Sequence, residues 1–357
     1  MQKQIYLEES AQSEKVEIMD PLADTRWDRL LESYPAATIF HSSSWAKVLC
    51  ESYGCRPMYF LVRADDRLLG LVASMEIDSW LTGRRGVALP FTDHSEPLVS
   101  EDADKQKLIN ALLNRGRARG WKSFVLHGGS NLVDPTVPSL GFYKHSLDLS
   151  PPCEPLLKGC KDTVRRHVRQ AQRNGLTTEI GSSSSLMEAY YLLHCLTRKK
   201  HGLPPQPVEF FRSIQTNLLE RGLGFVTIVR KEARPIAGAV FLHQGTQAFY
   251  KFGASNEGDL HLRGNNLVMW ESICHLKKQG LLTLDFGRTS IANEGLRKYK
   301  LGWGTQESVV QYYRFDFRKN RFLEDTDQAF GLHNRIFGKM PLPLLVWCGR
   351  MLYRHAA

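Results

Sequence analysis

The sequence predicts an α/β protein of the α+β type, built from two similar modules that lie side by side. The order helix, β-hairpin, helix, strand occurs twice along the 357 residues, which indicates a repeated module. The composition, with 42% hydrophobic and 24% charged residues, is typical of a globular protein large enough for two domains. Three prolines within residues 151–155 indicate a linker between the modules.

We therefore expect a first domain over residues 1–150, a second over residues 151–320 and a basic, apolar tail over residues 321–357. The predicted elements of the first domain are helices at 22–33 and 43–52, a hairpin around Asp65 and Asp66, a helix at 102–120 and a strand at 121–128. Serines at 42–44 can cap the free amides of the second helix. Apolar residues at helical spacing predict the third helix.

The second domain repeats this order. Its predicted elements are a helix at about 155–174, a strand at 176–180, helices at 186–201 and 207–221, an antiparallel meander at 225–253, a helix at 265–279 and a strand at 281–287. The meander is predicted because three apolar, β-rich runs are separated by KEARP and HQGTQ.

Charge and cysteine content narrow the possible partners. Residues 1–150 carry a net charge of −3 and residues 151–357 one of +13, so we expect the second domain to face an anion such as phosphate, nucleic acid or a lipid surface. A merely solvated basic surface is the alternative. The seven cysteines form no CxxC pair and no zinc-like cluster with histidine, which predicts free thiols and no metal site.

The polar N-terminus does not resemble a signal peptide, and no apolar stretch is long enough to span a bilayer. These features favour a cytoplasmic protein. The helix predicted at 155–174 carries Arg165, Arg169 and Arg173 at intervals of four residues. Such a stripe can bind phosphates through paired guanidinium hydrogen bonds, or it can simply be solvated.

Two further segments carry candidate binding residues. The helix predicted at 265–279 begins with Gly264, Asn265 and Asn266, and its free amides can bind an anion that Gly264 lets approach closely, although asparagine is also an ordinary helix cap. The strand at 281–287 leads to Asp285 and Arg288.

Asp285 could act as a general base, orient an amine, or form a salt bridge with Arg288 or Lys298. Trp303, between two glycines, could be a packing residue or a surface on which a substrate stacks.

These segments, taken in order, resemble the Fem aminoacyltransferases of peptidoglycan bridges and the related acetyltransferase-like proteins, a branch of the GNAT superfamily. The matching pieces are RRHVRQAQRNGL, PIAGAVFLHQGTQAFYKFGAS, NNLVMWESICHLKKQG, and DFGRTS followed by LRKYKLGWGT. In the first domain FHSSSWAKVLCESYG and GRRGVALPFTDHSEPLV are similar to the N-terminal lobe of the same proteins. The resemblance covers nearly the whole chain.

The resemblance implies two tandem GNAT-like lobes, each a largely antiparallel sheet flanked by helices, with a substrate cleft between them. It implies transfer of an activated acyl group to an amine, with aminoacyl-tRNA or acyl-CoA as a co-substrate and no bound cofactor. The coenzyme A loop of GNAT proteins, [QR]xxGx[GA], would fall near residues 260–267. LHLRGNNL has Arg263 and Gly264 at a different spacing, which argues against acyl-CoA.

An amine that attacks an ester or thioester must lose a proton, so Asp285 and Asp93 are the carboxylates expected to deprotonate or orient it. Arg165, Arg169, Arg288 and Lys298 are expected to hold the phosphates of a nucleotide-linked or lipid-linked precursor. Lys47 falls in the region where some relatives place a substrate-binding lysine.

The tail at 328–357 has four Lys or Arg, no acidic residue and an apolar run, which is typical of a segment on an anionic membrane. A helix packed over the second lobe is the alternative. We therefore expect a cytoplasmic Fem-like acyl or aminoacyl transferase, which the tail could hold at the inner face of the membrane. It would act on an amine of a peptidoglycan or exopolysaccharide precursor. The alternatives are an acyl-CoA-dependent N-acyltransferase acting on an amino sugar and a non-catalytic scaffold that binds RNA or membrane.

Overall fold

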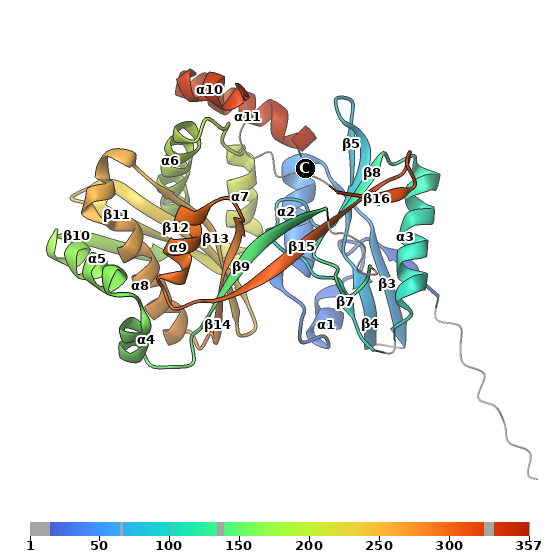
Figure 1. Ribbon diagram of the computed structural model, residues 1–357, viewed down its shortest axis with the longest axis horizontal. Coiled ribbons are helices and arrows are strands. Elements are labelled where there is room, and N and C mark those ends of the chain that lie inside the picture. Colours follow the sequence, from blue (N-terminus) through green and yellow to red (C-terminus); the bar gives the residue numbers. More distant parts are fainter. Residues whose placement is uncertain (1–14, 65–66, 102, 134–138, 325–331, 357) are drawn as a thin grey trace, which may run out of the picture.

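The computed structural model describes residues 15–64, 67–101, 103–133, 139–324 and 332–356. Two lobes lie side by side and a pair of C-terminal helices crosses one edge of both (Figure 1). The first lobe contains β1 (Glu17–Met19), α1 (Trp27–Glu32), α2 (Ser43–Tyr53), β2 (Arg56–Pro57), β3 (Tyr59–Ala64), β4 (Arg67–Val72), β5 (Met75–Ser79), β6 (Gly83–Val87), β7 (Leu98–Val99), α3 (Lys105–Arg119), β8 (Ser123–His127) and β9 (Leu140–Asp148).

The second lobe follows the same order on a larger scale. It contains α4 (Cys153–Gly159), α5 (Asp162–Arg173), β10 (Leu176–Gly181), α6 (Ser184–Lys200), α7 (Val208–Asn217), β11 (Gly224–Lys231), β12 (Arg234–Gln244), β13 (Gln247–Ser255), α8 (Gly264–Lys278), β14 (Thr283–Ser290), α9 (Glu294–Leu301), β15 (Gln306–Asp316) and β16 (Arg321–Leu323). Single-turn 3-10 helices occur at Ile39–His41 and Leu219–Arg221, and a longer one at Glu257–Leu262.

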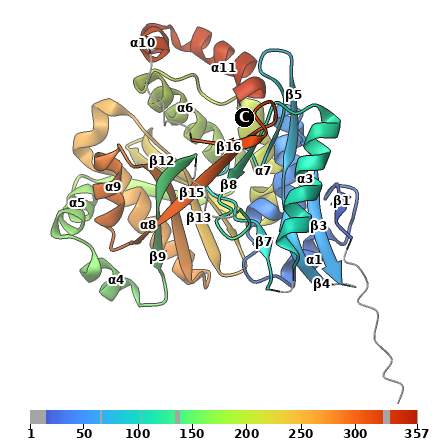
Figure 2. The same ribbon diagram turned by 45° about the vertical axis from the view of Figure 1, so that its right-hand side comes forward.

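One large sheet joins the two lobes. Its strands follow the order β10-β11-β12-β13-β14-β9-β15-β8-β6-β5-β2, with β16 on β15, while β1, β3, β4 and β7 form a separate sheet. In each lobe a parallel strand pair is connected through a helix: β6 and β8 through α3, and β13 and β14 through α8. β9 and β15 cross between the lobes (Figures 1 and 2). The predicted repeat of one mixed α/β module is therefore present.

Local sequence explains most of the helix ends. The Ser42 hydroxyl accepts a hydrogen bond from the Trp45 amide at 3.2 Å, so the predicted serine cap of α2 is confirmed. Asp104 caps α3 in the same way, through the Lys107 amide at 2.9 Å. β11, β12 and β13 form the predicted antiparallel meander. The predicted hairpin turn at Asp65 and Asp66 lies outside the described residues, but the flanking strands pair antiparallel.

One predicted helix is wrong. Residues 155–174 form two helices, α4 and α5, because the backbone at Cys160 is extended, with ψ of 153°. The guanidinium of Arg165 donates hydrogen bonds to the carbonyl oxygens of Lys158 at 2.7 Å and Cys160 at 2.6 Å, and it also pairs with Asp162. These carbonyls lie at the end of α4 and have no partner within the helix, so Arg165 stabilises the break.

The lobes share a buried apolar core. α2 of the first lobe packs against α7 of the second, and the rings of Trp45 and Phe210 meet edge to face at 6.2 Å. Tyr53 also contacts Phe210, at 5.2 Å between ring centroids. Because this shared core is aromatic and excludes water, it fixes the geometry of any site between the lobes.

The tail forms α10 (Leu332–Lys339) and α11 (Leu342–Ala356). α11 packs over α6 and reaches the β5–β6 hairpin of the first lobe. The side chain of Leu345, a residue of α11, is completely buried. Ser79 contacts the His355 ring at 2.9 Å, and the Arg198 guanidinium donates to the Tyr353 hydroxyl at 2.8 Å. The expectation of a helix packed over the second lobe is thus met, and α11 also contacts the first lobe.

Candidate active site

The site is created where two neighbouring strands diverge. β13 and β14 pair in parallel only through residues 247–249 and 283–285. After Asp285 the register of β14 shifts, and from Arg288 onward the strand pairs with β9 only. β13 continues with β12, so the two strands separate at Asp285. Polar groups that would otherwise be covered by the neighbouring strand become available to a ligand here.

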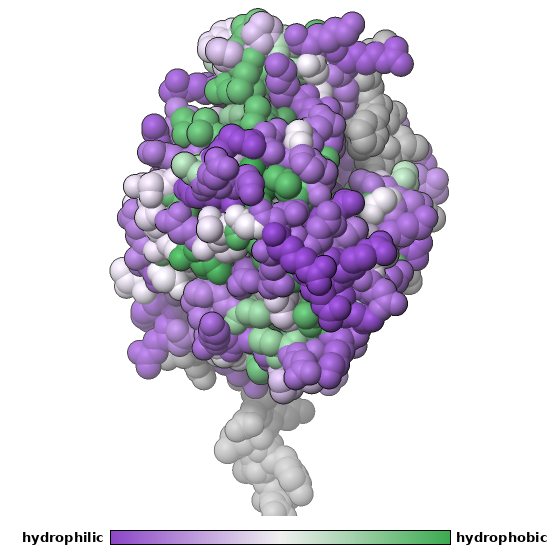
Figure 3. Space-filling view, turned by 90° about the vertical axis from the view of Figure 1, so that its left-hand side faces the viewer, coloured by the Kyte–Doolittle hydropathy of each residue, from purple (hydrophilic) through white to green (hydrophobic). Residues whose placement is uncertain are grey.

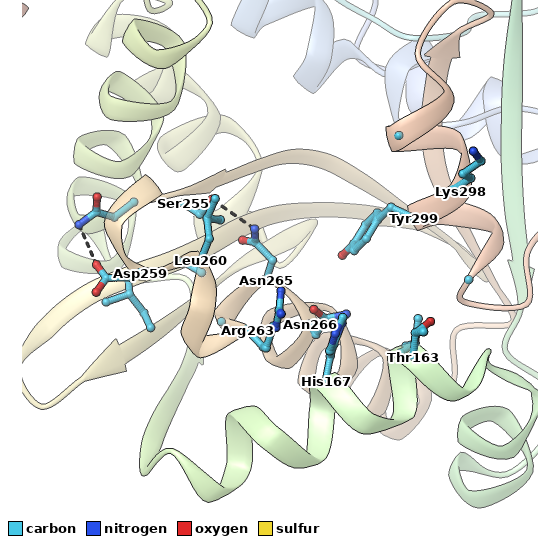
Figure 4. Close-up of a pocket in the computed structure, with 17 residues that line it drawn as sticks. Thr163, His167, Ser255, Asp259, Leu260, Arg263, Asn265, Asn266, Lys298 and Tyr299 are labelled. Atoms are coloured by element: carbon cyan, nitrogen blue, oxygen red, sulfur yellow. Dashed lines mark hydrogen bonds between the residues drawn. The ribbon is translucent and has the colours of Figure 1, made fainter.

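A first cleft, which we call the α8 cleft, opens beyond the end of β13 and has a volume of about 430 Å³. α5 lies on one side of it and α9 on the other (Figure 4). Its polar lining comes from Thr163, His167, Ser255, Asn256, Asp259, Arg263, Asn265, Asn266, Lys298 and Tyr299. In Figure 4, Tyr299 points from α9 into the cavity, whereas the Lys298 side chain points away from α5.

The first turn of α8 is suited to an anion. Arg263 precedes the helix with a left-handed backbone, φ of 62°, and offers no side-chain cap to the free amides. Its Nε is buried and has no hydrogen-bond partner among the described residues. A strained backbone and an unsatisfied guanidinium nitrogen are costly unless a ligand uses them. The Asn265 amide donates to the Ser255 hydroxyl at 3.2 Å and closes the rim.

Gly264 has a different role from the one expected. A Cβ atom at this position would lie 3.0 Å from the Cβ of Ala237 on β12. The glycine therefore lets the start of α8 pack closely against the sheet, rather than only letting a ligand approach. It still lines the α8 cleft.

A second cleft, the inter-lobe cleft, has a volume of about 430 Å³ and receives side chains from both lobes. Its charged and polar lining includes Arg85, Asp93, His127, Arg198, Lys251 and Arg288. It shares Arg85 and Val125 with an open groove of about 1030 Å³, which Lys122, Arg314 and Arg318 also line. The groove and the inter-lobe cleft thus adjoin, and we call them together the cationic depression because most of their charged lining residues are basic.

Asp93 and Asp285 come together at the point of divergence. Both line a small cavity with Lys251 and Gly287. Gly287 has φ of 71°, and a Cβ there would lie 2.5 Å from the Asp93 carboxylate, so the carboxylate rests against the glycine. Arg288 Nε lies 3.9 Å from Asp93, and Lys144 Nζ lies 3.3 Å from Asp285. The expected salt bridge of Asp285 to Arg288 or Lys298 is replaced by the one to Lys144.

The Asp93 loop is itself held under strain. Leu89 and Phe91 both have positive φ angles, 44° and 62°. The Tyr312 hydroxyl donates to the Asp93 carbonyl oxygen at 2.5 Å. Non-glycine residues in this conformation persist only where surrounding contacts hold them, and they cluster at functional sites. The loop therefore presents the Asp93 carboxylate in a fixed position.

Lys251 is a buried cation at the centre of this site. It is the extra residue of a β-bulge, because Val240 pairs with Phe252 and Phe241 with Tyr250. Its Nζ donates to the Phe91 carbonyl oxygen at 2.6 Å and lies 5.4 Å from the ring centre of Phe40. Burial lowers the pKa of Lys251, and the carboxylates of Asp93 and Asp285 oppose that change.

Lys300 fixes the strand at the same point from the other side. Its Nζ donates to the carbonyl oxygens of Gly287 at 2.8 Å and Arg288 at 3.0 Å. Burial lowers the pKa of Lys300 to about 8, against the attraction of Asp93 and Asp285. Because Lys300 is buried and its ammonium group is bound to two carbonyl oxygens of β14, we assign it to stabilising the strand rather than to contacting a substrate.

The pKa of Lys300 gives a testable pH dependence. Folded Lys300 titrates near pH 8 and an unfolded lysine near 10.5, so the unfolded chain binds more protons between these pH values. Wild type should therefore gain about 3 kcal/mol of unfolding free energy relative to Lys300→Met as pH rises from 8 to 10.5. Urea unfolding of both proteins across this range measures the difference. Parallel pH profiles would contradict the lowered pKa.

The structure places several predicted site residues elsewhere. Trp303 is 1% exposed and packs edge to face on Tyr299 at 6.3 Å, so it is a packing residue and not a stacking surface. Lys47 lines neither cleft and pairs with Glu51 at 3.8 Å along α2. Arg165 is engaged at the α4–α5 break, and Arg169 lies in a separate hollow on the outer face of α5. Lys298 lines the α8 cleft and Arg288 the inter-lobe cleft.

Sequence reasoning missed Lys251 and Lys300. Lys251 lies in the run AFYKFG, where a lysine interrupts an apolar, aromatic strand, and a buried strand rarely tolerates an unpaired charge. That signal was available. Lys300 lies among Lys298 and Arg297 on a short helix, and nothing in the sequence distinguishes the buried cation from its solvated neighbours.

Residues 158–307 match the acetyltransferase (GNAT) domain family. Among curated proteins none matches the chain. Among solved structures, FemX has a TM-score of 0.64 at 14% identity, covering 85% of this chain and 97% of that one. L-PGS from Bacillus licheniformis has a TM-score of 0.53 at 13% identity, with coverages of 88% and 96%. A tandem GNAT protein from the clavulanic acid biosynthesis pathway has 0.51 at 12%, with coverages of 85% and 98%.

Residues 158–307 form a GNAT acetyltransferase domain. The chain thus carries the domain of an acyltransferase, and the predicted tandem GNAT fold is confirmed. The α8 cleft and the divergence of β13 from β14 lie within the GNAT domain, whereas Asp93 comes from the other lobe. At identities of 12–14%, the likeness to these solved structures shows the fold alone.

Three further properties concern metal binding, the cysteines and membrane crossing. The described residues of the GNAT domain and its partner lobe contain no group of three or more metal-binding side chains. All seven cysteines are free thiols. Within the described part of the chain, no helix is both long and apolar enough to cross a membrane.

Proposed function

We propose that this chain forms an amide bond on an amine of a cell-envelope precursor, either of peptidoglycan or of an exopolysaccharide. The observation that carries the proposal is the carboxylate–lysine cluster of Asp93, Asp285 and Lys251, which adjoins the inter-lobe cleft and is linked to the α8 cleft through α9. Lys298 and Tyr299 of α9 line the α8 cleft, and the next residue, Lys300, contacts the carbonyl of Arg288, which lines the inter-lobe cleft. A donor in the α8 cleft and an acceptor in the inter-lobe cleft would thus lie on the two sides of α9 and β14, and their reacting groups would have to meet at the cluster.

The reaction needs no nucleophile from the protein. The amine attacks the acyl carbonyl, a C–N bond forms, and the bond to the leaving thiolate or ribose oxygen breaks. The Asp93 carboxylate takes the proton that the amine loses, because it is the half-exposed carboxylate of the cluster. Asp285 is held by the Gly287 amide at 2.6 Å and by Lys144, so it orients the attacking amine. The Lys251 ammonium lies where it can stabilise the negative charge on the acyl oxygen.

The α8 cleft suits the activated donor. The free amides of α8, with Arg263 and Lys298, would hold donor phosphates. GNAT domains typically use acyl-CoA, which favours a coenzyme A ester. The outer face of α5, with Arg166, Arg169 and Arg173, instead offers a polyanion a second contact and favours aminoacyl-tRNA.

A nucleotide-linked or lipid-linked precursor suits the inter-lobe cleft. Arg85, Arg198 and Arg288 line the cleft, and the adjoining groove adds Lys122 and Arg318. Guanidinium groups bind phosphates through paired hydrogen bonds, so a diphosphate of the precursor could be held here while its amine points to Asp93.

Thermal-shift measurements with acetyl-CoA, longer acyl-CoA esters, aminoacyl-tRNA, UDP-amino sugars and a UDP-linked muropeptide test the proposal. Stabilisation by a donor and by an acceptor, followed by detection of the amide product by mass spectrometry, is the expected result. Silence across the panel together with salt-sensitive RNA binding that persists in Asp93→Asn would instead favour the non-catalytic scaffold.

Charge removal distinguishes the two donors. We expect Arg263→Ala with Lys298→Ala to weaken binding of either donor by about 10-fold or more, since hydrogen bonds to charged groups are lost. Arg169→Ala is the discriminating variant, because it should weaken binding of aminoacyl-tRNA and leave a coenzyme A ester unaffected. Affinity is measured by titration calorimetry. Unchanged affinity in the Arg263–Lys298 variant would show that the donor does not bind in the α8 cleft.

A further inference from the structure

An apolar surface with a basic rim runs along one edge of the molecule. α10, α11 and the tip of the β5–β6 hairpin share that edge in both ribbon views (Figures 1 and 2). We call this the edge surface. Its exposed apolar side chains are Trp80, Leu81, Ile336, Leu344, Trp347, Met351 and Leu352.

α11 carries exposed apolar residues on the face opposite to the one that packs on the protein. Leu345 and Gly349 of the same helix are buried against the body, which leaves Leu344, Trp347 and Met351 on the opposite face at helical spacing. Trp347 is 59% exposed, and Trp80 on the hairpin tip is 83% exposed. One exposed tryptophan on the tail helix and another on a hairpin of the first lobe need an explanation, because such residues are costly in water.

The edge surface includes two elements that lie far apart in the sequence. The ring of Trp80 meets His355 of α11 edge to face at 5.5 Å, and Thr82 donates to the His355 carbonyl oxygen at 3.3 Å. The hairpin tip is therefore held beside the end of α11. Figure 3 shows hydrophobic side chains also gathered at the upper end of the face over α6 and α10.

The charged residues of α10 and α11 themselves are all basic. Arg335 and Lys339 of α10 and Arg350 and Arg354 of α11 are all exposed, and neither helix contains an acidic residue. Arg350 pairs with Glu209 at 2.8 Å, and its side chain remains 68% exposed. A protein partner would need a matching acidic rim, whereas an anionic bilayer offers negative headgroups around an apolar interior everywhere on its surface.

We propose that the edge surface docks on an anionic lipid bilayer, with Trp80 and Trp347 in the interfacial layer and the basic rim on the headgroups. Tryptophan prefers that layer because its ring is apolar and its N–H stays hydrogen-bonded. Exposed apolar stripes with Lys and Arg beside them are typical of helices that lie in the plane of a membrane. This inference does not depend on the acyl transfer proposed above.

Docking in this way would place the open end of the cationic depression next to the bilayer. Thr82 and His355 line the open groove that adjoins the inter-lobe cleft. Both residues also adjoin the edge surface, so the groove would open beside the bilayer. A lipid-linked precursor could then enter from the membrane, and only this consequence rests on the proposed function.

Vesicle sedimentation of the full chain tests the docking. We expect binding to vesicles of phosphatidylcholine with 30% phosphatidylglycerol (a probe composition of about one anionic lipid in three) and much weaker binding to phosphatidylcholine alone. Tryptophan fluorescence should shift to the blue on binding. Trp80→Glu with Trp347→Glu should abolish the shift and lower the partition coefficient at least about 10-fold.

The charge contribution has its own variant. Arg335→Gln with Lys339→Gln should weaken binding to the anionic vesicles about fivefold for each residue removed. Val309→Glu replaces an exposed apolar residue, 60% exposed on β15, away from the edge surface and should bind as wild type does. Circular dichroism of every variant separates loss of binding from loss of fold.

Three outcomes would overturn the proposal. Equal binding to neutral and anionic vesicles would show that the basic rim does not contribute. Absence of binding to both kinds of vesicle would show that the edge surface does not bind membranes. A chain that is dimeric in light scattering, and that becomes monomeric in the Trp347→Glu variant, would show that a second copy covers the edge surface. Because none of these readouts uses catalysis, an inactive enzyme that still binds vesicles would contradict only the proposed function.

Discussion

Asp93→Asn should lower kcat by about two to four orders of magnitude. Asparagine keeps the size of the side chain but cannot accept a proton, and general-base catalysis contributes about that factor. The carboxylate is 38% exposed and lines both the small cavity and the inter-lobe cleft. Its attraction to the buried Lys251 and Lys300 is also lost in the variant, so denaturant unfolding has to accompany the kinetics. Steady-state kinetics with the donor and acceptor found by thermal shift give the measurement.

Two companion variants interpret that result. Asp285→Asn should reduce kcat less, because its amide oxygen can still accept from the Gly287 N–H. Glu179→Gln removes an acidic residue of β10 that is 55% exposed and pairs with Arg230 away from the clefts, and should keep wild-type kinetics. If Asp93→Asn raised KM with kcat unchanged, Asp93 would bind the amine without taking its proton.

Trp303→Ala should cost about 3 to 5 kcal/mol of unfolding free energy, the range measured for truncation of large buried aromatic residues. Trp303 is 1% exposed and lies in the core of the GNAT domain, and its backbone carbonyl accepts from the Cys160 thiol at 3.6 Å. Removing the ring leaves a cavity between α5, α9 and the sheet that the rigid surroundings cannot fill. Denaturant unfolding reports the loss.

Trp80→Ala is the matched control for this variant, because the same side chain is removed from an exposed hairpin tip. It should change the unfolding free energy by no more than about 0.5 kcal/mol. A stable Trp303→Ala protein with weakened substrate affinity would reverse the assignment and restore the stacking surface expected from the sequence.

The fold could be predicted because its signals are local. Ser42 caps α2 through a neighbouring amide, and the β11–β13 meander follows from runs of β-rich residues separated by turns. The single helix expected at 155–174 failed for the opposite reason. Its break at Cys160 depends on the Arg165 guanidinium reaching back to carbonyls in the preceding helix, a contact that apolar periodicity does not report.

The candidate site was predicted in part. Asp93 and Asp285 were chosen one from each lobe, and the structure brings both to one cavity. The arginine stripe was expected at the substrate, yet Arg169 lies on the outer face of α5. A charge pattern along a helix identifies a basic face but not the direction in which the folded chain turns it.

The sequence by itself determined the two α/β modules, the excess positive charge of the second and the amphipathic tail, because each is written in the identity and spacing of nearby residues. Only the tertiary structure decided which polar groups share a cavity. The separation of β13 from β14 at Asp285, the bulge at Lys251 and the burial of Lys300 depend on strand pairing between distant segments. Burial then changes a lysine's pKa, and no local pattern reveals which lysine will be buried.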